Sequence, residues 1–353
     1  MKLKKPSDNA DALHCDVLWQ FRANETFNVF CVDRVLSPPT LGLILGGEDG
    51  IIRVYEMEGQ PSAEPKAMVE TKGGPIQCLA THNVTRLGQV DILAADAHGT
   101  LTVVCGQQIL CRQSLASHAI TCLQVQEDGR GYLEIVSSTE TGLITACQSS
   151  SQLWTINLND HIKVSRRCFV AVKCLLSVEL PDCHGHNVQY LLAVDDTCQL
   201  HLILQGHIVA SFNTPAQVTA MAQGVFVPSS QLSMPASPGA GGGHYKQVAL
   251  GTDTGAIYIF YNMAISAEEI VRSESPITHL AALEMPDSPL DLLLCAGHVK
   301  ALNVYRHDKL IHRYATKDWI NCMVTADLDK DGTREVIIGC MDRTIAALKF
   351  SPF

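Results

Sequence analysis

Apolar and polar residues alternate along most of the chain, and one alternating unit returns seven times. The unit is a short apolar stretch, a small or polar tetrad, a turn residue and a second, alternating apolar stretch. Successive side chains of a strand point to opposite faces, so this alternation indicates half-buried β-strands. The copies occupy residues 41–56, 90–104, 133–147, 190–204, 247–261, 291–305 and 335–350.

A turn residue occupies the same place in every copy. Four of the seven are glycines, which accept the positive φ of a tight hairpin without a steric penalty. The copies follow one another at intervals of about 45 residues or somewhat more, which is the size of a four-stranded propeller blade. The turn residues are Gly50, Gly99, Gly142, Gln199, Gly255, Lys300 and Arg343.

Each hairpin has a further apolar strand before it, and six of them have a more polar strand after it. Two apolar inner strands and a half-polar outer strand are typical of sheets that pack face to face. The chain is therefore predicted to be all-β and to form a seven-bladed β-propeller. A six-bladed ring with one orphan repeat is the alternative, whereas helical repeats are disfavoured by the β-branched residues and frequent turns.

The seventh copy has no fourth strand after it, but an unpaired alternating segment, LHCDVLWQF, stands at residues 13–21. We predict that residues 13–21 pair in antiparallel fashion with residues 344–350, because a closed ring leaves no sheet edge exposed. The chain would then have a disordered tail at residues 1–12 and a single propeller at residues 13–353. Residues 228–245 are rich in Pro, Ser and Gly, which predicts a flexible insertion in blade 5.

The 353 residues include 26 Lys and Arg against 36 Asp and Glu, which gives a net charge of −10. A nucleic-acid-binding surface would be basic, so no nucleic-acid partner is expected. No apolar run approaches the roughly 18 residues of a membrane span, and no apolar stretch follows the N-terminal lysines, so neither a transmembrane segment nor a secretory signal is expected. The 14 cysteines include no Cys-x-x-Cys, which favours reduced core thiols in a cytoplasmic protein over a disulfide framework.

The strongest local motif is an acidic loop in the seventh copy, where Asp327, Asp329, Asp331 and Glu335 surround Gly332. Carboxylates at this spacing converge when the loop turns sharply, as they do in Ca²⁺-binding loops. The alternative is a structural turn whose carboxylates accept hydrogen bonds from the loop's own amides. The sequence leaves both alternatives open: the loop is a weak Ca²⁺ site, or it is a structural turn and the protein has no cofactor. The matching loops of blades 2 and 3 have lost most of these carboxylates, which favours a mainly structural role for the loop. Their residues at the matching positions are Asn83, Thr85, Gly88 and Asp91 in blade 2, and Gln126, Asp128, Gly131 and Glu134 in blade 3.

Residues 326–350, ADLDKDGTREVIIGCMDRTIAALKF, resemble the FG-GAP repeat of integrin-α-type propellers, and the chain is more loosely similar to propellers of the Bardet–Biedl coat complex. No WD dipeptide closes the repeats, which argues against the WD40 family. The resemblance implies a non-enzymatic scaffold that binds other protein subunits of a larger assembly and reaches membranes only through them. It implies a KICSTOR-like regulator of TOR nutrient signalling at the lysosomal surface, or a Bardet–Biedl-type ciliary trafficking subunit at the ciliary base.

Catalytic constellations are poor, and the sequence assigns no catalytic residue. The glycine-rich stretch 239–244 lacks the Gly-Lys-Ser/Thr ending of a phosphate-binding loop. The ligand-type residues at 183–186 are too close together to form a tetrahedral zinc site without a distant partner. A hydrolase or lyase that uses the central channel is the alternative of another class, and its candidate groups near one mouth are His82, Glu179, Glu284 and Asp327.

Limited proteolysis tests the insertion. Residues 228–245 offer little apolar area to bury, so we expect a non-specific protease to cut there before it cuts any blade. Mass spectrometry of the first two fragments locates the cut. Protection as strong as that of the strands would show that the segment is docked on the ring.

Overall fold

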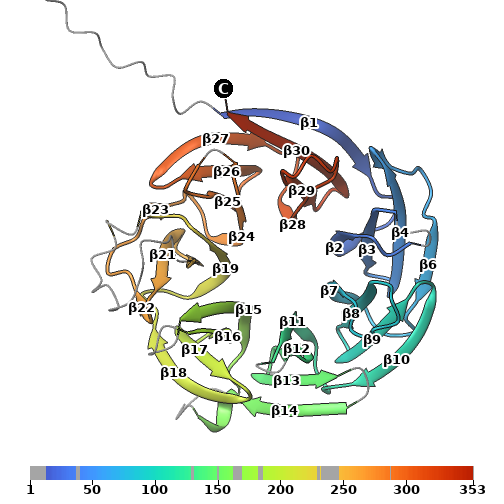
Figure 1. Ribbon diagram of the computed structural model, residues 1–353, viewed down its shortest axis with the longest axis horizontal. Helices are drawn as coiled ribbons and strands as arrows, with labels where there is room; N and C mark the ends of the chain where they lie inside the picture. Colours follow the sequence, from blue (N-terminus) through green and yellow to red (C-terminus); the bar gives the residue numbers. More distant parts are fainter. Residues whose placement is uncertain are drawn as a thin grey trace, which may run out of the picture.

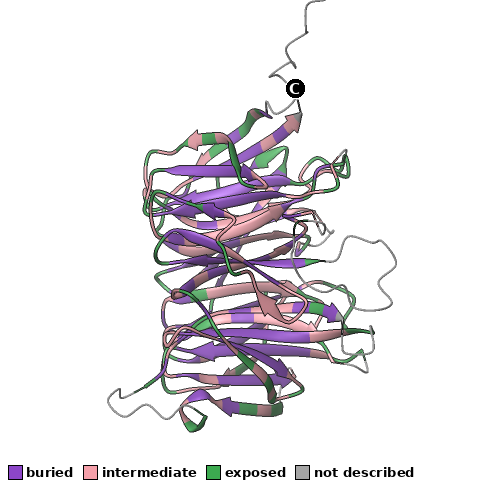
Figure 2. Ribbon diagram, turned by 90° about the vertical axis from the view of Figure 1, so that its left-hand side faces the viewer, coloured by how far each residue is buried: buried purple, intermediate pink, exposed green. Residues whose placement is uncertain are grey.

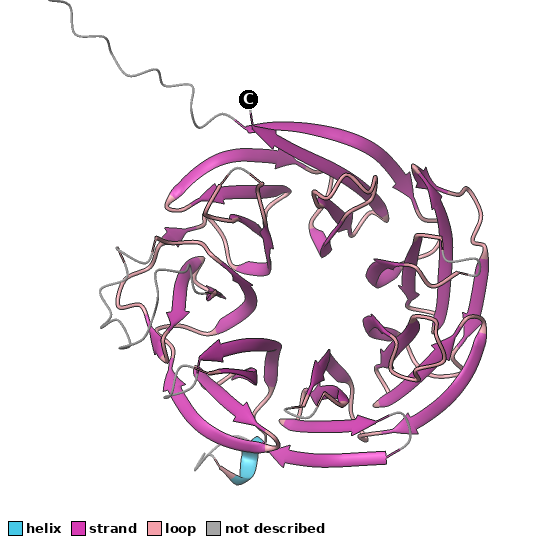
Figure 3. Ribbon diagram, in the orientation of Figure 1, coloured by secondary structure: helices cyan, strands magenta, loops and turns pink. Residues whose placement is uncertain are grey.

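The computed structural model describes residues 13–36, 40–128, 131–148, 151–161, 169–181, 186–228, 231, 246–286 and 288–352. These residues form seven antiparallel sheets around a central axis, which confirms the predicted seven-bladed all-β propeller (Figure 1). The one helical element among them, the 3₁₀ turn η1 (Leu158–Asp160), lies outside the ring of strands (Figure 3). No helix in the described part of the chain is long and apolar enough to cross a membrane.

Within blades 1 to 6 the strands follow chain order from the axis outward. Blades 1 to 3 contain β2 (Phe27–Asp33), β3 (Gly42–Gly47), β4 (Ile51–Glu58), β5 (Gln60–Pro61) and β6 (Ala67–Glu70); β7 (Ile76–His82), β8 (Asp91–Asp96), β9 (Thr100–Cys105) and β10 (Gln108–Ser114); and β11 (Ile120–Glu127), β12 (Leu133–Thr139), β13 (Leu143–Gln148) and β14 (Ser151–Asn157). Blades 4 to 6 contain β15 (Val172–Pro181), β16 (Asn187–Asp195), β17 (Gln199–Leu204) and β18 (His207–Asn213); β19 (Val218–Gly224), β20 (Gln247–Thr252), β21 (Ala256–Tyr261), β22 (Ala264–Ile265) and β23 (Val271–Arg272); and β24 (Ile277–Leu283), β25 (Leu292–Gly297), β26 (Ala301–Arg306) and β27 (Lys309–Ala315).

Blade 7 is built from both ends of the chain and confirms the predicted closure. Its strand order is β1 (Leu13–Arg22), β30 (Thr344–Pro352), β29 (Glu335–Cys340) and β28 (Ile320–Ala326). The β1–β30 pairing is antiparallel and runs from Leu13 opposite Pro352 to Arg22 opposite Thr344, with one bulge at Leu18. The two strands lie side by side at the rim in Figure 1. The ring therefore has seven complete blades, and the six-bladed alternative is wrong.

Burial changes with distance from the axis. Every residue of the second strands β8, β20, β25 and β29 is buried, because these strands lie between the faces of two neighbouring blades. Outer strands such as β10 and β18 alternate exposed and half-buried residues, as predicted. The innermost strands are less buried than the sequence suggested, since one side of each faces the axis. Figure 2 shows buried residues running through the interior of the ring and exposed residues gathered at the turns.

A bulge follows the first residue of every innermost strand. In four of the seven blades the side chain at the bulge donates a hydrogen bond to the neighbouring blade. Asn28 Nδ2 donates to the Ile76 carbonyl at 3.0 Å, and Asn321 Nδ2 donates to the Phe27 carbonyl at 3.1 Å. Thr219 Oγ1 donates to the carbonyl of Ile277 in the same way. These bonds satisfy backbone groups at the seams, where water has little access.

Glycines near the end of the second strand let the blades approach one another. A Cβ on Gly46 would stand 2.7 Å from Ile76, and a Cβ on Gly251 would stand 2.8 Å from Ile277. A Cβ on Gly339 would collide with the ring of Phe30 in the same manner. Close contact at the seams therefore explains these glycines, whose φ angles are not positive.

The turn prediction is confirmed at the glycines and is one residue off in blade 4. Gly50 has a φ of 75° and Gly142 a φ of 84°, as a tight hairpin requires. In blade 4 the left-handed residue is Cys198, with a φ of 61°, because Gln199 already pairs with Asn213 in the sheet. Lys300 has no positive φ, so its turn has another geometry.

The twelve cysteines in the described part of the chain are all free thiols, in agreement with the sequence. Cys322 Sγ donates to the carbonyl of Phe30 across the seam between blades 7 and 1. Burial raises the pKa of the Cys322 thiol to about 11, so it stays protonated near neutral pH. The tail at residues 1–12 and most of the insertion at residues 228–245 lie outside the described residues, and so do Cys183 and His184.

Removal of the closing strand tests how much the ring depends on it. Deletion of residues 1–22 exposes the edge of β30 and removes the buried side chains of Leu13 and Trp19. We expect the melting temperature to fall by about 10 °C or more, as measured by differential scanning fluorimetry. Deletion of residues 1–12 alone is the control and should leave it unchanged. Equal melting temperatures for both deletions would contradict the closure.

Candidate functional site

The acidic loop between β28 and β29 brings three of its four predicted residues together. Asp327, Asp329 and Glu335 each offer a carboxylate oxygen, and these atoms lie within 4.8 Å of one another. Asp331 does not belong to this triplet. Glu335 is fully buried, whereas Asp329 is exposed. The triplet is the only such group of His, Cys, Asp or Glu in the described part of the chain.

A lysine that the sequence analysis missed contacts three of the four carboxylates of the loop. Lys349 Nζ lies 2.6 Å from Asp329 Oδ2, 2.5 Å from Asp331 Oδ2 and 3.0 Å from Glu335 Oε1. The carboxylates raise the pKa of Lys349, and Lys349, followed by Thr333, lowers the pKa of Asp331. An ammonium of this chain therefore occupies the position where carboxylates of such a loop usually converge on a metal.

The same carboxylates also hold the loop through its amides. Leu328 N donates to Glu335 Oε2 at 2.8 Å, and Gly332 N donates to Asp327 Oδ2 at 3.2 Å. In blade 2, Thr85 N donates to Asp91 Oδ2 at 2.8 Å, so the residue that corresponds to Glu335 has the same capping role. Each bond contributes about 1 kcal/mol to the turn.

The residues fit Ca²⁺ only in part. Ca²⁺ takes six to eight oxygens, and three carboxylates that converge would supply the core of such a shell. Asp327 Oδ1 is buried and accepts no hydrogen bond, which leaves it free to ligate. A divalent ion would have to displace the Lys349 ammonium from Asp329 and Glu335, so the electrostatic gain of binding would be reduced.

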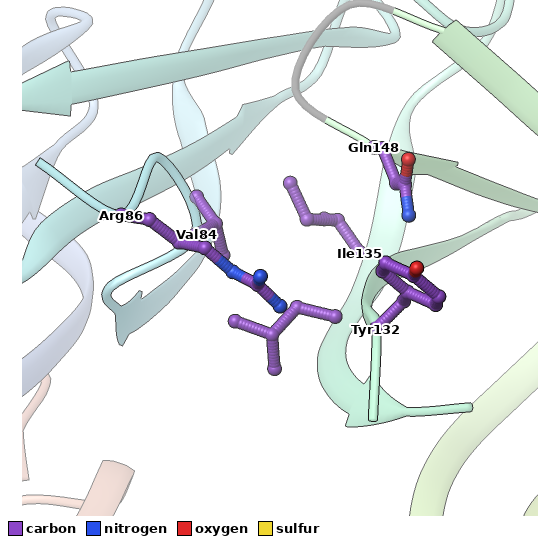
Figure 4. A pocket seen from close by; sticks show the side chains of 6 residues that line it. Val84, Arg86, Tyr132, Ile135 and Gln148 are labelled. Carbon is purple, nitrogen blue, oxygen red and sulfur yellow. The ribbon is translucent and has the colours of Figure 1, made fainter. Parts of the chain in front are cut away.

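A cavity of about 150 Å³ lies between blades 2 and 3 at the ends of their loops. Its wall from blade 2 consists of Val84 and Arg86, and its wall from blade 3 consists of Tyr132, Leu133, Ile135 and Gln148. Figure 4 shows Arg86 reaching across the cavity toward the side chains of blade 3. The sequence analysis missed this site, because its two walls come from different repeats. The sequence signal was Tyr132, a large aromatic residue in an otherwise polar loop.

The groups proposed for channel chemistry do not assemble. His82, Glu179 and Glu284 are exposed, and none of them joins Asp327 in a group of convergent ligands among the described residues. Catalysis by a general acid and base needs such groups within hydrogen-bonding reach of one substrate.

A hydrogen-bonded relay in blade 4, formed by Asp195, His201 and the exposed Ser211, has the composition of a catalytic triad. His201 lies 2.9 Å from Asp195 Oδ2 and 2.9 Å from Ser211 Oγ, and both Asp195 and His201 are buried. Burial raises the pKa of Asp195, but hydrogen bonds from His201 and Thr197 outweigh it and leave that pKa below its usual value. The three side chains stand on adjacent strands of one sheet, and Ser211 pairs directly with His201 in the ladder. The relay therefore ties β16, β17 and β18 together.

Comparison with known proteins defines the class of the molecule as a β-propeller. No protein-family model and no curated protein matches the sequence. The fold is similar to the crystal structure of BBS1N in complex with ARL6DN, with a TM-score of 0.69 and 10% sequence identity over 95% of this chain and 96% of that chain. It is also similar to the WD40 β-propeller domain of Doa1, with a TM-score of 0.65 and 9% identity over 95% and 97% of the two chains. No sequence match supports the FG-GAP resemblance, which stays an expectation.

Replacement of Lys349 tests the acidic loop. We expect the wild-type chain to bind Ca²⁺ weakly, with a Kd on the order of 0.1–1 mM or above, and Lys349→Met to bind it at least about tenfold more tightly. Isothermal titration measures both, and Asp329→Ala in the Lys349→Met background is the control that should abolish binding. Submicromolar binding by the wild type, lost in Asp329→Ala, would show that Ca²⁺ displaces the ammonium and regulates the loop.

Proposed function

We propose that this propeller is a non-enzymatic scaffold that binds other protein subunits of a larger assembly. The observation that carries the proposal is the surface around the cavity between blades 2 and 3. There Tyr132 lines the cavity together with Arg86 and is 52% exposed, and Leu87, which follows Arg86 in the chain, is 64% exposed. Large apolar, aromatic and arginine side chains at one pocket are typical of the anchors of protein interfaces.

The alternative function as an enzyme has less support. The candidate groups at the channel mouth stay apart, and the relay at His201 stands within a sheet rather than beside a described cavity. Asp195 and His201 are buried, and Ser211 lies directly opposite His201 in the β17–β18 ladder, so the relay links neighbouring strands of one sheet. The rigid ring is better suited to present loops than to close around a substrate.

Among assemblies, a trafficking coat of the Bardet–Biedl type has one specific observation in its favour. The fold matches BBS1N over nearly all of both chains, and that propeller was crystallised in complex with ARL6DN. We therefore place this role first, with a site of action in the cytoplasm near the ciliary base and contact with membranes through partners. The KICSTOR-like role in TOR signalling at the lysosomal surface rests on the resemblance of residues 326–350 alone.

The state of the chain in cells tests the scaffold proposal. The tagged chain is expressed at its natural level, purified from cell extracts and run on a size-exclusion column. We expect it to elute in a complex whose mass is well above the 38.3 kDa of the chain, together with at least one stoichiometric partner. Leu87→Asp with Tyr132→Asp should remove a partner without changing the melting temperature, because both side chains are exposed. Val209→Asp, at an exposed position on the outer strand β18, is the matched control. A chain that elutes alone from every extract would contradict the scaffold role.

A further inference from the structure

The size of the cavity between blades 2 and 3 selects one kind of occupant. Pockets that enclose metabolites or cofactors measure roughly 300–1,000 Å³. At about 150 Å³ this cavity has room for a single side chain and not for a whole small molecule. Tyr132 at its edge is 52% exposed, so its ring offers apolar surface beyond the cavity, as a partner polypeptide would require.

The floor of the cavity is aliphatic. Ile135 is buried in the core shared by blades 2 and 3, and Val84 packs against the same core from the loop of blade 2. Leu133 completes the floor from blade 3. A branched aliphatic side chain that enters would remove apolar surface from water both on itself and on the cavity floor, which favours binding.

The rim of the cavity carries a positive charge that lacks a counter-charge. Arg86 is the only charged residue among the described residues of the lining, and no described carboxylate forms an ion pair with it. Its one described hydrogen bond is a long contact of 3.4 Å from Nη2 to the carbonyl of Gly131. Arg86 also has a φ of 56°, a conformation that costs free energy in a residue with a Cβ. A carboxylate that accepts hydrogen bonds from the guanidinium of Arg86 would form the charge-assisted pair that this group lacks.

The backbone amides around the cavity are already used. Val84 N donates to His82 O, and Thr85 N donates to Asp91. On the other wall Gly131 N donates to Asp128 O, and Tyr132 N donates to Asp128 Oδ1. A C-terminal carboxylate is usually bound by several free amides, so the arrangement favours an acidic side chain within a chain over a chain end.

We propose that this cavity binds a segment of a partner protein in which a leucine, isoleucine or valine stands beside an aspartate or glutamate. The aliphatic side chain fills the space above Ile135, and the carboxylate pairs with Arg86 while the Gln148 amide closes the far rim. The inference rests on the proposed scaffold function and names the chemistry of the partner that this function requires.

Peptide selection on the full chain tests the proposal. Phage-displayed random decapeptides are panned on the immobilised wild-type protein, and the most enriched sequence is synthesised with a fluorescent label for polarisation measurements. We expect enriched sequences to pair an aliphatic residue with Asp or Glu, and Arg86→Glu to weaken binding of the labelled peptide at least tenfold. Panning on Arg86→Glu should replace the acidic residue by Lys or Arg, because the charge at the rim is reversed.

Two further variants separate recognition from folding. Arg112→Glu reverses an exposed charge on the outer strand of the same blade, outside the cavity, and should bind the peptide as the wild type does. Arg86→Gln keeps the shape of the rim without its charge and should weaken binding at an unchanged melting temperature. Enriched sequences without acidic residues, or equal binding by Arg86→Glu, would overturn the cavity proposal. If the cellular complex nevertheless persists, the scaffold function stands and its contact lies elsewhere.

Discussion

The pairing of β1 with β30 is the interaction on which the rest of the structure depends. A sheet leaves a row of unpaired N–H and C=O groups at each edge, and a ring of sheets also needs every blade to have two neighbours. The two ends of the chain meet both needs at once, since β1 completes blade 7 and Ala23 N donates to Arg343 O just beyond it. Arg343 then donates to the carbonyl of Asn24, which fixes the passage from the last blade into the first.

Two features recur at the seams between blades. The bulge residue at the start of the inner strand donates to the next blade in four of the seven blades, as Asn28 and Asn321 do. Glycines such as Gly46 and Gly339 allow the faces of neighbouring blades to touch. The sheets are therefore held by packing and by directed hydrogen bonds together. A ring of this kind leaves its loops free to differ, because none of them is needed to hold the blades in place.

The loops at one end of the ring show two different uses of charge. In blade 7 the ammonium of Lys349 contacts Asp329, Asp331 and Glu335, so part of the negative charge of the loop is balanced by a residue of the same chain. Between blades 2 and 3 the guanidinium of Arg86 has no such partner among the described residues. Charge that is satisfied internally stabilises a turn, whereas charge that is left over beside an apolar cavity is available to a partner.

The sequence by itself determined the seven repeats and the all-β fold, because the alternation of a strand and the glycine of a tight turn can be seen within a few residues. It also determined the closure, because counting the strands along the chain shows one missing after the last hairpin and one extra before the first. It also identified the acidic loop, whose ligands lie within nine residues of one another, although it placed the blade 4 turn at Gln199 instead of Cys198. Only the tertiary structure decided that Lys349 lies among the carboxylates of that loop and that a cavity opens between blades 2 and 3. Lys349 reaches Glu335 through the register of β29 and β30, and Arg86 faces Tyr132 through the packing of two blades. Such contacts depend on which strands pair and how the sheets stack, and no periodicity within one strand records either.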